Sequence, residues 1–213
     1  MIQLKDINKS FDEKPILTDV SLNINKNEFV SIVGASGAGK TTLLNIIGLL
    51  DKPDSGIIKI ADYENPTKKE IQYLRRYILG YIFQNYVLME NETVSTNLLL
   101  SKTYNKDFNK ELLTITLEKV GLDSTFLNKK VYMLSGGEQQ RLAIARIMLK
   151  PCNIILADEP TGNLDSKNKK MIVSLFHDLK KLGKTIVCVT HDNEIAEGSD
   201  RIIQINRKGV LEL

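Results

Sequence analysis

The stretch Gly34-Ala35-Ser36-Gly37-Ala38-Gly39-Lys40-Thr41 decides the fold, because it matches the pattern G-x-x-x-x-G-K-[ST] of a phosphate-binding loop. A buried apolar run at 29–33 precedes it, and a predicted helix from Lys40 to about Leu50 follows it, as this loop requires. Its glycines allow backbone N–H groups to turn inward around phosphate oxygens, and the helix N-terminus adds unpaired donors. Lys40 is therefore predicted to reach the β- and γ-phosphates of a nucleoside triphosphate, and the Thr41 hydroxyl to bind Mg²⁺. A glycine-rich turn without a ligand is the alternative, and the strand–loop–helix context argues against it.

Strands and helices alternate on both sides of this loop. Within residues 1–84, strands are predicted at 2–7 and 20–24 before the loop and at 57–60 and 78–83 after it, and a helix opens at Thr67, where Glu70 completes a capping box. After Pro151 the sequence predicts a strand at 154–157, a helix over about 166–182, a strand at 185–189 and a terminal hairpin of 201–205 with 210–213. This alternation is typical of an α/β protein with a mainly parallel sheet.

The segment 85–150 differs, because it has helical spacing in Leu112, Ile115 and Val120, a helix expected at 136–149, and no clear strand. We therefore predict one domain over 1–213. Within it, 1–84 and 151–213 form a nucleotide-binding α/β core, and 85–150 forms an inserted helical subdomain.

Two acids follow the predicted buried strand 154–157 directly. Ligands of open α/β sheets bind outside the carboxyl ends of strands, so Asp158 and Glu159 should point at the phosphates. Asp158 suits the Mg²⁺ shell, which leaves Glu159 to orient or deprotonate a water molecule. An Asp-Glu pair after a strand is by itself more often a solvated turn, and the phosphate-binding loop favours the functional interpretation.

Composition excludes several classes of protein. The chain has 213 residues, 42% hydrophobic and 26% charged, with a net charge of +3, which indicates a globular protein and gives no case for a nucleic-acid partner. Cys152 and Cys188 lie in apolar runs without metal-type spacing and are predicted to be buried thiols. The N-terminus does not resemble a signal peptide and no stretch approaches a membrane span, so we expect a cytoplasmic protein.

Further motifs resemble those of the ABC (ATP-binding cassette) ATPase family. The run Leu134-Ser-Gly-Gly-Glu-Gln-Gln-Arg141 looks like its signature sequence, just upstream of the Asp158-Glu159 strand. Gln84 resembles the Q-loop glutamine, Asn163-Leu164-Asp165 the D-loop, and His191 the switch histidine. With the phosphate-binding loop, these motifs stand in family order over nearly the whole chain.

The resemblance implies a P-loop NTPase core with an N-terminal antiparallel β-subdomain and an inserted α-helical subdomain. It also implies a head-to-tail dimer of two copies with ATP and Mg²⁺ between them. The nucleotide would contact the phosphate-binding loop of one copy (Gly34, Ala35, Ser36, Gly37, Ala38, Gly39, Lys40, Thr41 and Thr42) and Ser135, Gly136 and Gly137 of the other. Glu159 would be the catalytic base, with His191 on the γ-phosphate and Asp165 coupling the two sites.

The resemblance implies roles for two further residues. Gln84 would join Thr41 and Asp158 near the metal or the attacking water, and report to a membrane permease docked near 84–96. Phe11 is the best candidate for stacking on adenine, and a core or turn role is the alternative. His177 matches no motif, and Lys167, Lys169 and Lys170 are interpreted as a solvated helix face.

The run Ala157-Asp-Glu-Pro-Thr-Gly-Asn-Leu-Asp165 looks most like the subgroup of lipoprotein-releasing, macrolide- or peptide-exporting and division-associated ATPases, with bacteriocin-export ATPases also similar. The expected function is therefore an ATPase subunit that powers a separate permease at the inner face of the membrane. The alternative is an ATPase that regulates a membrane complex without transport.

Overall fold

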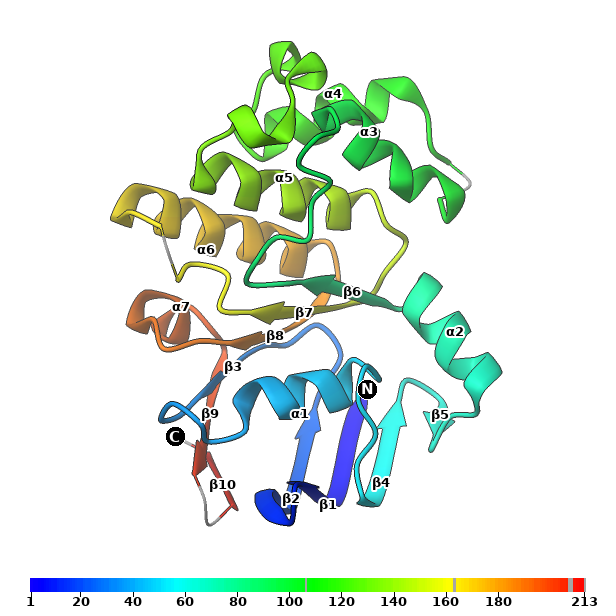
Figure 1. The fold of residues 1–213 in the computed structure, drawn as a ribbon, viewed down its shortest axis with the longest axis vertical. Coiled ribbons are helices and arrows are strands. Elements are labelled where there is room, and N and C mark those ends of the chain that lie inside the picture. The colour runs from blue at the N-terminus through cyan, green and yellow to red at the C-terminus, as the bar shows by residue number, and fades with distance from the viewer. Residues whose placement is uncertain (106, 163, 207–208, 213) are drawn as a thin grey trace.

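The computed structural model describes residues 1–105, 107–162, 164–206 and 209–212, with side chains up to 206, and contains two sheets (Figure 1). The larger sheet has the strand order β10-β9-β3-β8-β7-β6. Its parallel strands are β3 (Phe29–Val33), β6 (Leu79–Ile82), β7 (Ile154–Asp158), β8 (Thr185–Val189) and β9 (Arg201–Asn206). The strand β10 (Gly209–Glu212) pairs with β9 in the antiparallel direction, which confirms the predicted hairpin.

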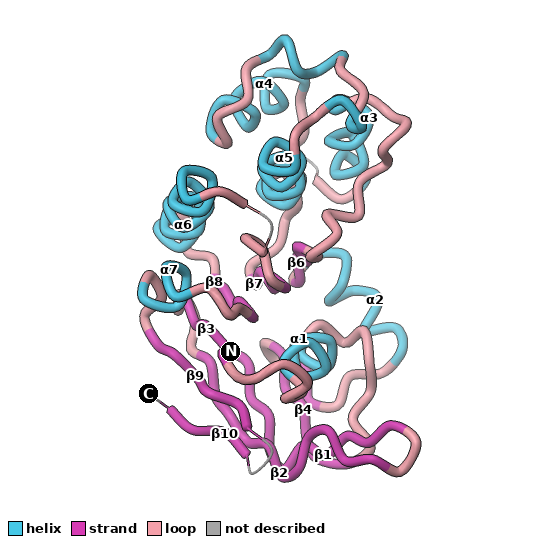
Figure 2. Tube along the Cα trace, turned by 60° about the vertical axis from the view of Figure 1, so that its left-hand side comes forward, coloured by secondary structure: helices cyan, strands magenta, loops and turns pink. Residues whose placement is uncertain are grey.

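The smaller sheet is antiparallel and has the order β2-β1-β4-β5. It comprises β1 (Ile2–Phe11), β2 (Lys14–Ile24), β4 (Ser55–Ile60) and the short β5 (Tyr63–Glu64). In β2, Val20, Leu22 and Ile24 are buried while the residues between them are exposed, so one face of this sheet packs on the core. The helix α1 (Lys40–Ile47) lies between the two sheets, and its apolar side chains share one cluster with residues of both (Figure 2).

The described residues between β6 and β7 form helices and turns, apart from an isolated bridge between Thr93 and Lys130. The elements here are α3 (Val94–Leu99), α4 (Lys110–Lys119), α5 (Gly136–Met148) and the short 3₁₀ helices η1 (Leu100–Thr103), η2 (Ser124–Asn128) and η3 (Val131–Met133). Outside this stretch lie α2 (Lys68–Tyr77), α6 (Ser166–Lys181) and α7 (Asn193–Glu197). In Figure 1, α5 and α6 cover one face of the larger sheet and α1 covers the other.

Successive side chains of the buried strands point to opposite faces of the sheet, which explains the helical layer on each face. In β7, Ile154 and Leu156 join the cluster that contains α1, whereas Ile155 and Ala157 join the cluster that contains α5 and α6. Every residue of β7 and β8 is buried, as expected of parallel strands covered on both faces. On the α6 side, the ring of Phe29 meets that of Phe176 edge-on at a centroid distance of 5.6 Å.

The elements match the expected fold class and differ from the prediction in detail. The strands β1 and β2 extend beyond the predicted 2–7 and 20–24. The helix α1 ends at Ile47 instead of about Leu50, because Leu49 adopts a left-handed conformation (φ 58°) that no α-helix continues. The short elements β5 and α7 were not predicted, since two and five residues carry too little periodicity. The capping box of Thr67 and Glu70 is confirmed. Among the residues that the structure describes, no helix has both the length and the apolar character that crossing a bilayer demands.

Candidate functional site

The phosphate-binding loop connects the carboxyl end of β3 to the first turn of α1. Gly39 has a left-handed backbone (φ 89°), and a Cβ atom there would lie 2.8 Å from Cδ2 of Leu17, so only glycine fits without strain. No side chain caps the helix at this position, so its first N–H groups are available to an anion. The Lys40 ammonium group donates to the carbonyl oxygens of Gly34 (2.8 Å) and Ala35 (3.1 Å), which holds the cation at the loop.

The Thr41 hydroxyl and Asp158 meet where α1 begins and β7 ends. Thr41 Oγ1 donates to Asp158 Oδ1 at 3.2 Å. Burial raises the pKa of Asp158, and the hydrogen bond from Thr41 offsets part of that effect. Two hard oxygen donors beside a phosphate-binding loop fit Mg²⁺, which characteristically takes one or two protein ligands and completes its shell with phosphate oxygens and water. The described residues contain no cluster of three or more acidic, His or Cys side chains that could hold a metal ion.

Glu159 and His191 form a pair at the same edge of the sheet. Glu159 follows β7 in a left-handed conformation (φ 46°), and its N–H donates to the carbonyl oxygen of Val189 at 2.9 Å. One Glu159 oxygen, Oε2, lies 2.8 Å from Nδ1 of His191 and 3.3 Å from its backbone nitrogen. The Glu159 side chain is 14% exposed and that of His191 69%, so the acid is shielded and the imidazole is accessible.

A hollow of about 430 Å³ brings these groups together. The predicted site residues that line this hollow are Phe11, Ser36, Gly37, Gly39, Lys40, Thr41, Thr42, Gln84, Glu159 and His191. Ile16 of the edge strand β2 also lines the hollow. The sequence did not predict Ile16 as a site residue, because it belongs to no motif. Phe11 is 48% exposed, which keeps its ring available to a ligand, and the Lys9 ammonium lies 5.1 Å from the ring centroid.

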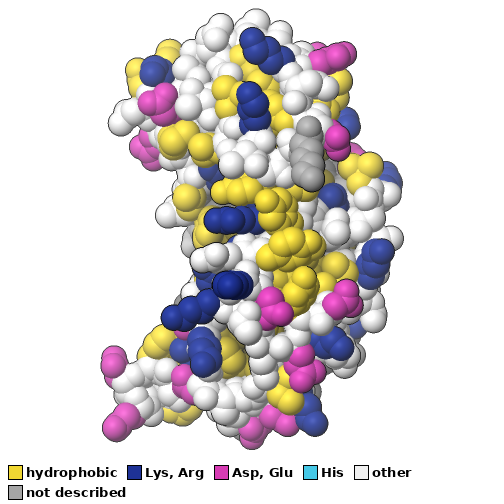
Figure 3. Space-filling view, turned by 90° about the vertical axis from the view of Figure 1, so that its right-hand side faces the viewer, with side chains coloured by type: hydrophobic (Ala, Val, Ile, Leu, Met, Phe, Trp, Pro, Cys, Tyr) yellow, Lys and Arg dark blue, Asp and Glu magenta, His cyan; other side chains and the backbone are white. Residues whose placement is uncertain are grey.

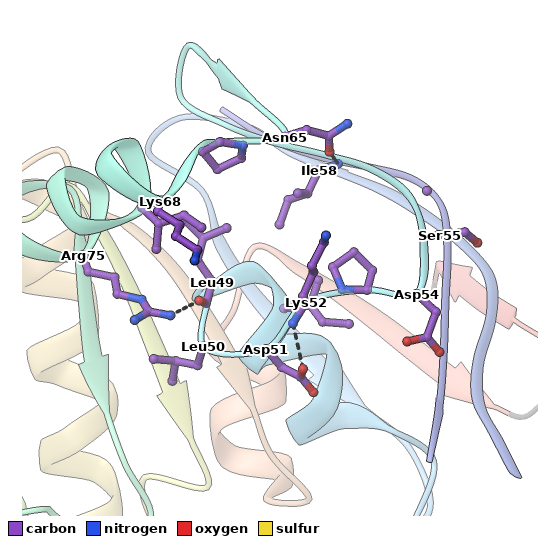
Figure 4. A pocket seen from close by; sticks show the side chains of 15 residues that line it. Leu49, Leu50, Asp51, Lys52, Asp54, Ser55, Ile58, Asn65, Lys68 and Arg75 are labelled. Atoms are coloured by element: carbon purple, nitrogen blue, oxygen red, sulfur yellow. Dashed lines mark hydrogen bonds between the residues drawn. The ribbon is translucent and has the colours of Figure 1, made fainter. Parts of the chain in front are cut away.

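A larger hollow of about 610 Å³ lies elsewhere, between the end of α1, β4 and α2, and contains none of the predicted site residues. Figure 4 shows Arg75 of α2 reaching the carbonyl oxygen of Leu49 at its edge. Volume alone therefore does not select the candidate site. The smaller hollow is the candidate because the phosphate-binding loop lines it together with Glu159 and His191.

The signature residues lie apart from the 430 Å³ hollow of their own chain. Ser135 caps α5 in a capping box with Glu138, and Gly136 and Gly137 form the first helical turn. A Cβ at Gly137 would lie 2.8 Å from the side chain of Asn168 on α6, so this glycine permits close packing of the two helices. Asp165 caps α6 by accepting from the Asn168 N–H at 2.8 Å. None of these four predicted site residues lines that hollow, and Asn163 of the predicted D-loop lies outside the described residues.

Asp192, next to His191, is a polar centre that the sequence did not reveal. Its carboxylate accepts from Lys169 Nζ (2.7 Å), Thr161 Oγ1 (3.1 Å) and the Glu194 N–H (3.0 Å). Burial alone would raise the pKa of Asp192, but these hydrogen bonds together lower it. The interpretation of Lys169 as a solvated lysine is wrong, because the ion pair with Asp192 fixes it. Cys152 and Cys188 are buried, as predicted.

Comparison with known proteins identifies close relatives. The family model described as ABC transporter matches residues 17–162. The chain is 41% identical to "Macrolide export ATP-binding/permease protein MacB" of Bdellovibrio bacteriovorus, over all of this chain but only 33% of MacB. It is 42% identical to "Lipoprotein-releasing system ATP-binding protein LolD" of Aquifex aeolicus, over 96% of this chain and 93% of LolD.

The fold has an equally clear counterpart among solved structures. A dimeric post-hydrolysis state of the ATP-binding cassette MJ0796, bound to ADP and Pi, superposes with a TM-score of 0.90 at 38% identity. The match covers all of this chain and 98% of that one. The chain thus resembles a nearly complete cassette, while it spans about a third of the MacB relative.

Proposed function

This chain belongs to the ABC transporter family and is an ABC-type ATPase, and on that basis we propose that it powers a membrane permease that exports a peptide, a lipoprotein or a drug. One observation carries the proposal, namely the convergence of Lys40, Thr41 and Glu159 in a single hollow at the carboxyl ends of β3 and β7. The names of the relatives MacB and LolD, which refer to macrolide export and lipoprotein release, support an export role.

In the proposed complex, the triphosphate lies over the N-terminus of α1. The loop glycines, Ala35 and Ser36 present backbone N–H groups, and Thr42 extends this set. The Ala38 N–H donates to the carbonyl oxygen of Ala35 and shapes the loop, and the Lys40 ammonium pairs with the outer phosphates. The half-exposed ring of Phe11 stacks on the adenine from the side of the smaller sheet. This arrangement fits a loop whose geometry at Gly39 leaves no room for a side chain.

The proposed chemistry is hydrolysis of the β–γ phosphoanhydride bond. A water oxygen attacks the γ-phosphorus while Glu159 accepts a proton from it, and the bond to the bridging oxygen breaks to give ADP and phosphate. Thr41 and Asp158, with Gln84 beside them, would hold Mg²⁺, which would supply positive charge to the phosphates. His191 is exposed enough to turn from Glu159 toward the γ-phosphate, which frees the carboxylate for the water.

The proposed active unit is a head-to-tail pair of copies. Ser135, Gly136 and Gly137 do not line the hollow of their own chain, and their N–H groups at the start of α5 suit the γ-phosphate held by a second copy. Asp165 at the start of α6 then couples the two sites. The dimeric state of the MJ0796 cassette supports this arrangement.

We place the permease on the face that contains α2 and the segment 84–96. Figure 3 shows a band of hydrophobic side chains across the side of the molecule that contains α2, with Lys and Arg side chains beside it. Exposed hydrophobic residues in this part of the chain include Tyr73, Tyr77, Val87, Leu99 and Leu100. A connected apolar surface of this kind is typical of a protein partner.

The test uses a tagged Glu159→Gln variant, expressed in its native cell and purified with ATP. We expect recovery of a stable complex with an integral membrane protein, contacted through 84–96 as judged by cross-linking from Val87. A partner that forms no transport pathway would indicate regulation of a membrane complex instead. Recovery of ATP-bound protein without any integral membrane partner would contradict the proposal.

A further inference from the structure

Two consecutive residues after Gln84 adopt a conformation that their side chains disfavour. Tyr86 and Val87 have φ values of 60° and 48°. A left-handed backbone is uncommon for any residue but glycine, and a β-branched residue such as Val87 is a genuine outlier there. Such strain costs on the order of 1–3 kcal/mol per residue and persists only where surrounding contacts enforce it.

Two backbone hydrogen bonds lie within the turn, from the Tyr86 N–H to the Phe83 carbonyl oxygen (3.0 Å) and from the Val87 N–H to that of Asn85 (2.6 Å). One side chain holds the turn from outside. Arg146 of α5 donates from Nη1 to the carbonyl oxygen of Val87 (2.7 Å) and from Nη2 to that of Tyr86 (3.1 Å). The two ends of one planar guanidinium group therefore fix two successive carbonyl groups. A lysine could not reproduce this pair of directions, because its ammonium group is a single point donor.

The same turn lies between the two halves of the proposed site. Gln84, two residues before Tyr86, lines the nucleotide hollow. The Tyr86 hydroxyl lies 3.3 Å from the position of a Cβ at Gly136, so the ring packs against the first turn of α5 in the signature sequence. Further along, the buried amide of Asn97 fixes Met89 through its N–H (2.8 Å) and its carbonyl oxygen (3.1 Å). The segment is thus clamped at both ends.

We propose that Arg146 is a positioning residue for catalysis, which holds the Tyr86–Val87 turn in its strained form and thereby keeps Gln84 in the nucleotide hollow and Tyr86 against the signature. This inference rests on the proposed function. Without the clamp, the turn relaxes out of the left-handed region, and Gln84 leaves the position in which it serves the reaction. The effect falls on the chemical step, because Lys40 and the phosphate-binding loop remain in place.

The test compares Arg146→Met with Lys150→Met in the purified full chain. Lys150 is a matched control, since its ammonium group also holds two backbone carbonyl oxygens, those of Arg75 (2.6 Å) and Leu79 (2.7 Å), without touching the turn. We expect Arg146→Met to lower kcat for Mg-ATP at least about tenfold, since misplacing a group by roughly 1 Å can cost about a hundredfold in rate. The affinity for ATP should change by less than about twofold. Lys150→Met should retain the wild-type kcat.

A second variant separates positioning from stability. Asparagine tolerates the left-handed region far better than valine, so Val87→Asn lowers the strain that the clamp has to oppose. Adding Val87→Asn to Arg146→Met should recover at least about a third of the lost kcat, whatever the melting temperature. Equal kcat losses in Arg146→Met and Lys150→Met, or no recovery in the double variant, would overturn the inference. An inactive wild-type chain would instead contradict the proposed function.

Discussion

Nδ1 of His191 lies 2.8 Å from Oε2 of Glu159, although 32 residues separate them in the chain. The register of the larger sheet explains the contact, because Asp158 of β7 pairs with Val189 of β8. Glu159 and His191 follow at the carboxyl ends of these two neighbouring strands. The proposed base is therefore in direct contact with the proposed phosphate sensor. Binding of a γ-phosphate by His191 would release the carboxylate only when substrate is present.

Replacement of Glu159 by glutamine removes the proton acceptor and keeps the shape of the side chain. General-base catalysis typically contributes 10²–10⁴-fold, so we expect steady-state phosphate release to fall by about that factor. Binding of ATP should persist, and the variant should accumulate as an ATP-bound dimer in size-exclusion chromatography. Undiminished hydrolysis by Glu159→Gln would assign the base to another group.

The loop glycines allow a test of backbone geometry without nucleotide. Both Gly37 (φ 74°) and Gly39 (φ 89°) are left-handed, but a Cβ meets nothing within 4 Å at Gly37 and collides with Leu17 at Gly39. Gly39→Ala should therefore cost about 1–3 kcal/mol more in the free energy of unfolding than Gly37→Ala, through overpacking. Urea denaturation of the two variants measures the difference, and equal costs would show that the loop relaxes freely.

Asp192 should give the protein a pH-dependent part of its stability. Because hydrogen bonds lower its pKa below the ordinary 3.8, its contribution is present above that value and is lost as the pH falls through the lower folded-state pKa. Asp192→Asn removes the charge that holds Lys169 and should cost about 1–2 kcal/mol at pH 7. Urea unfolding from pH 7 down to 3 should show the gap between variant and wild type closing below pH 3.8. A constant gap would mean that the ion pair adds nothing.

Much of the fold was predictable because its strands are short, fully apolar and bounded by strong turn signals. Residues 29–33 and 185–189 became strands with the expected ends, and the capping box at Thr67 marked α2. The elements that were missed, β5 and α7, are stabilised by the packing around them. The early end of α1 comes with the left-handed conformation of Leu49 (φ 58°), which no local sequence pattern marks.

The candidate site was predictable where chemistry follows a motif and hidden where it depends on contacts between distant segments. Lys40, Thr41 and Glu159 stand in local patterns, so sequence located them. The Asp192 centre joins Thr161, Lys169 and Glu194, which no local pattern connects. The Arg146 clamp is equally invisible in sequence, since a helix arginine is by default a solvated charge and its partners are backbone carbonyl groups about 60 positions upstream.

Binding of ATP to the purified chain in the presence of Mg²⁺ tests the central claim most directly. Isothermal titration calorimetry should show saturable binding of one ATP per chain. The Lys40→Ala variant should not bind ATP, because it lacks the ammonium group that lies at the loop. Thr41→Ala should bind ATP but lose the added affinity that Mg²⁺ gives. Absence of ATP binding by the wild-type chain, or equal binding by Lys40→Ala, would contradict the account.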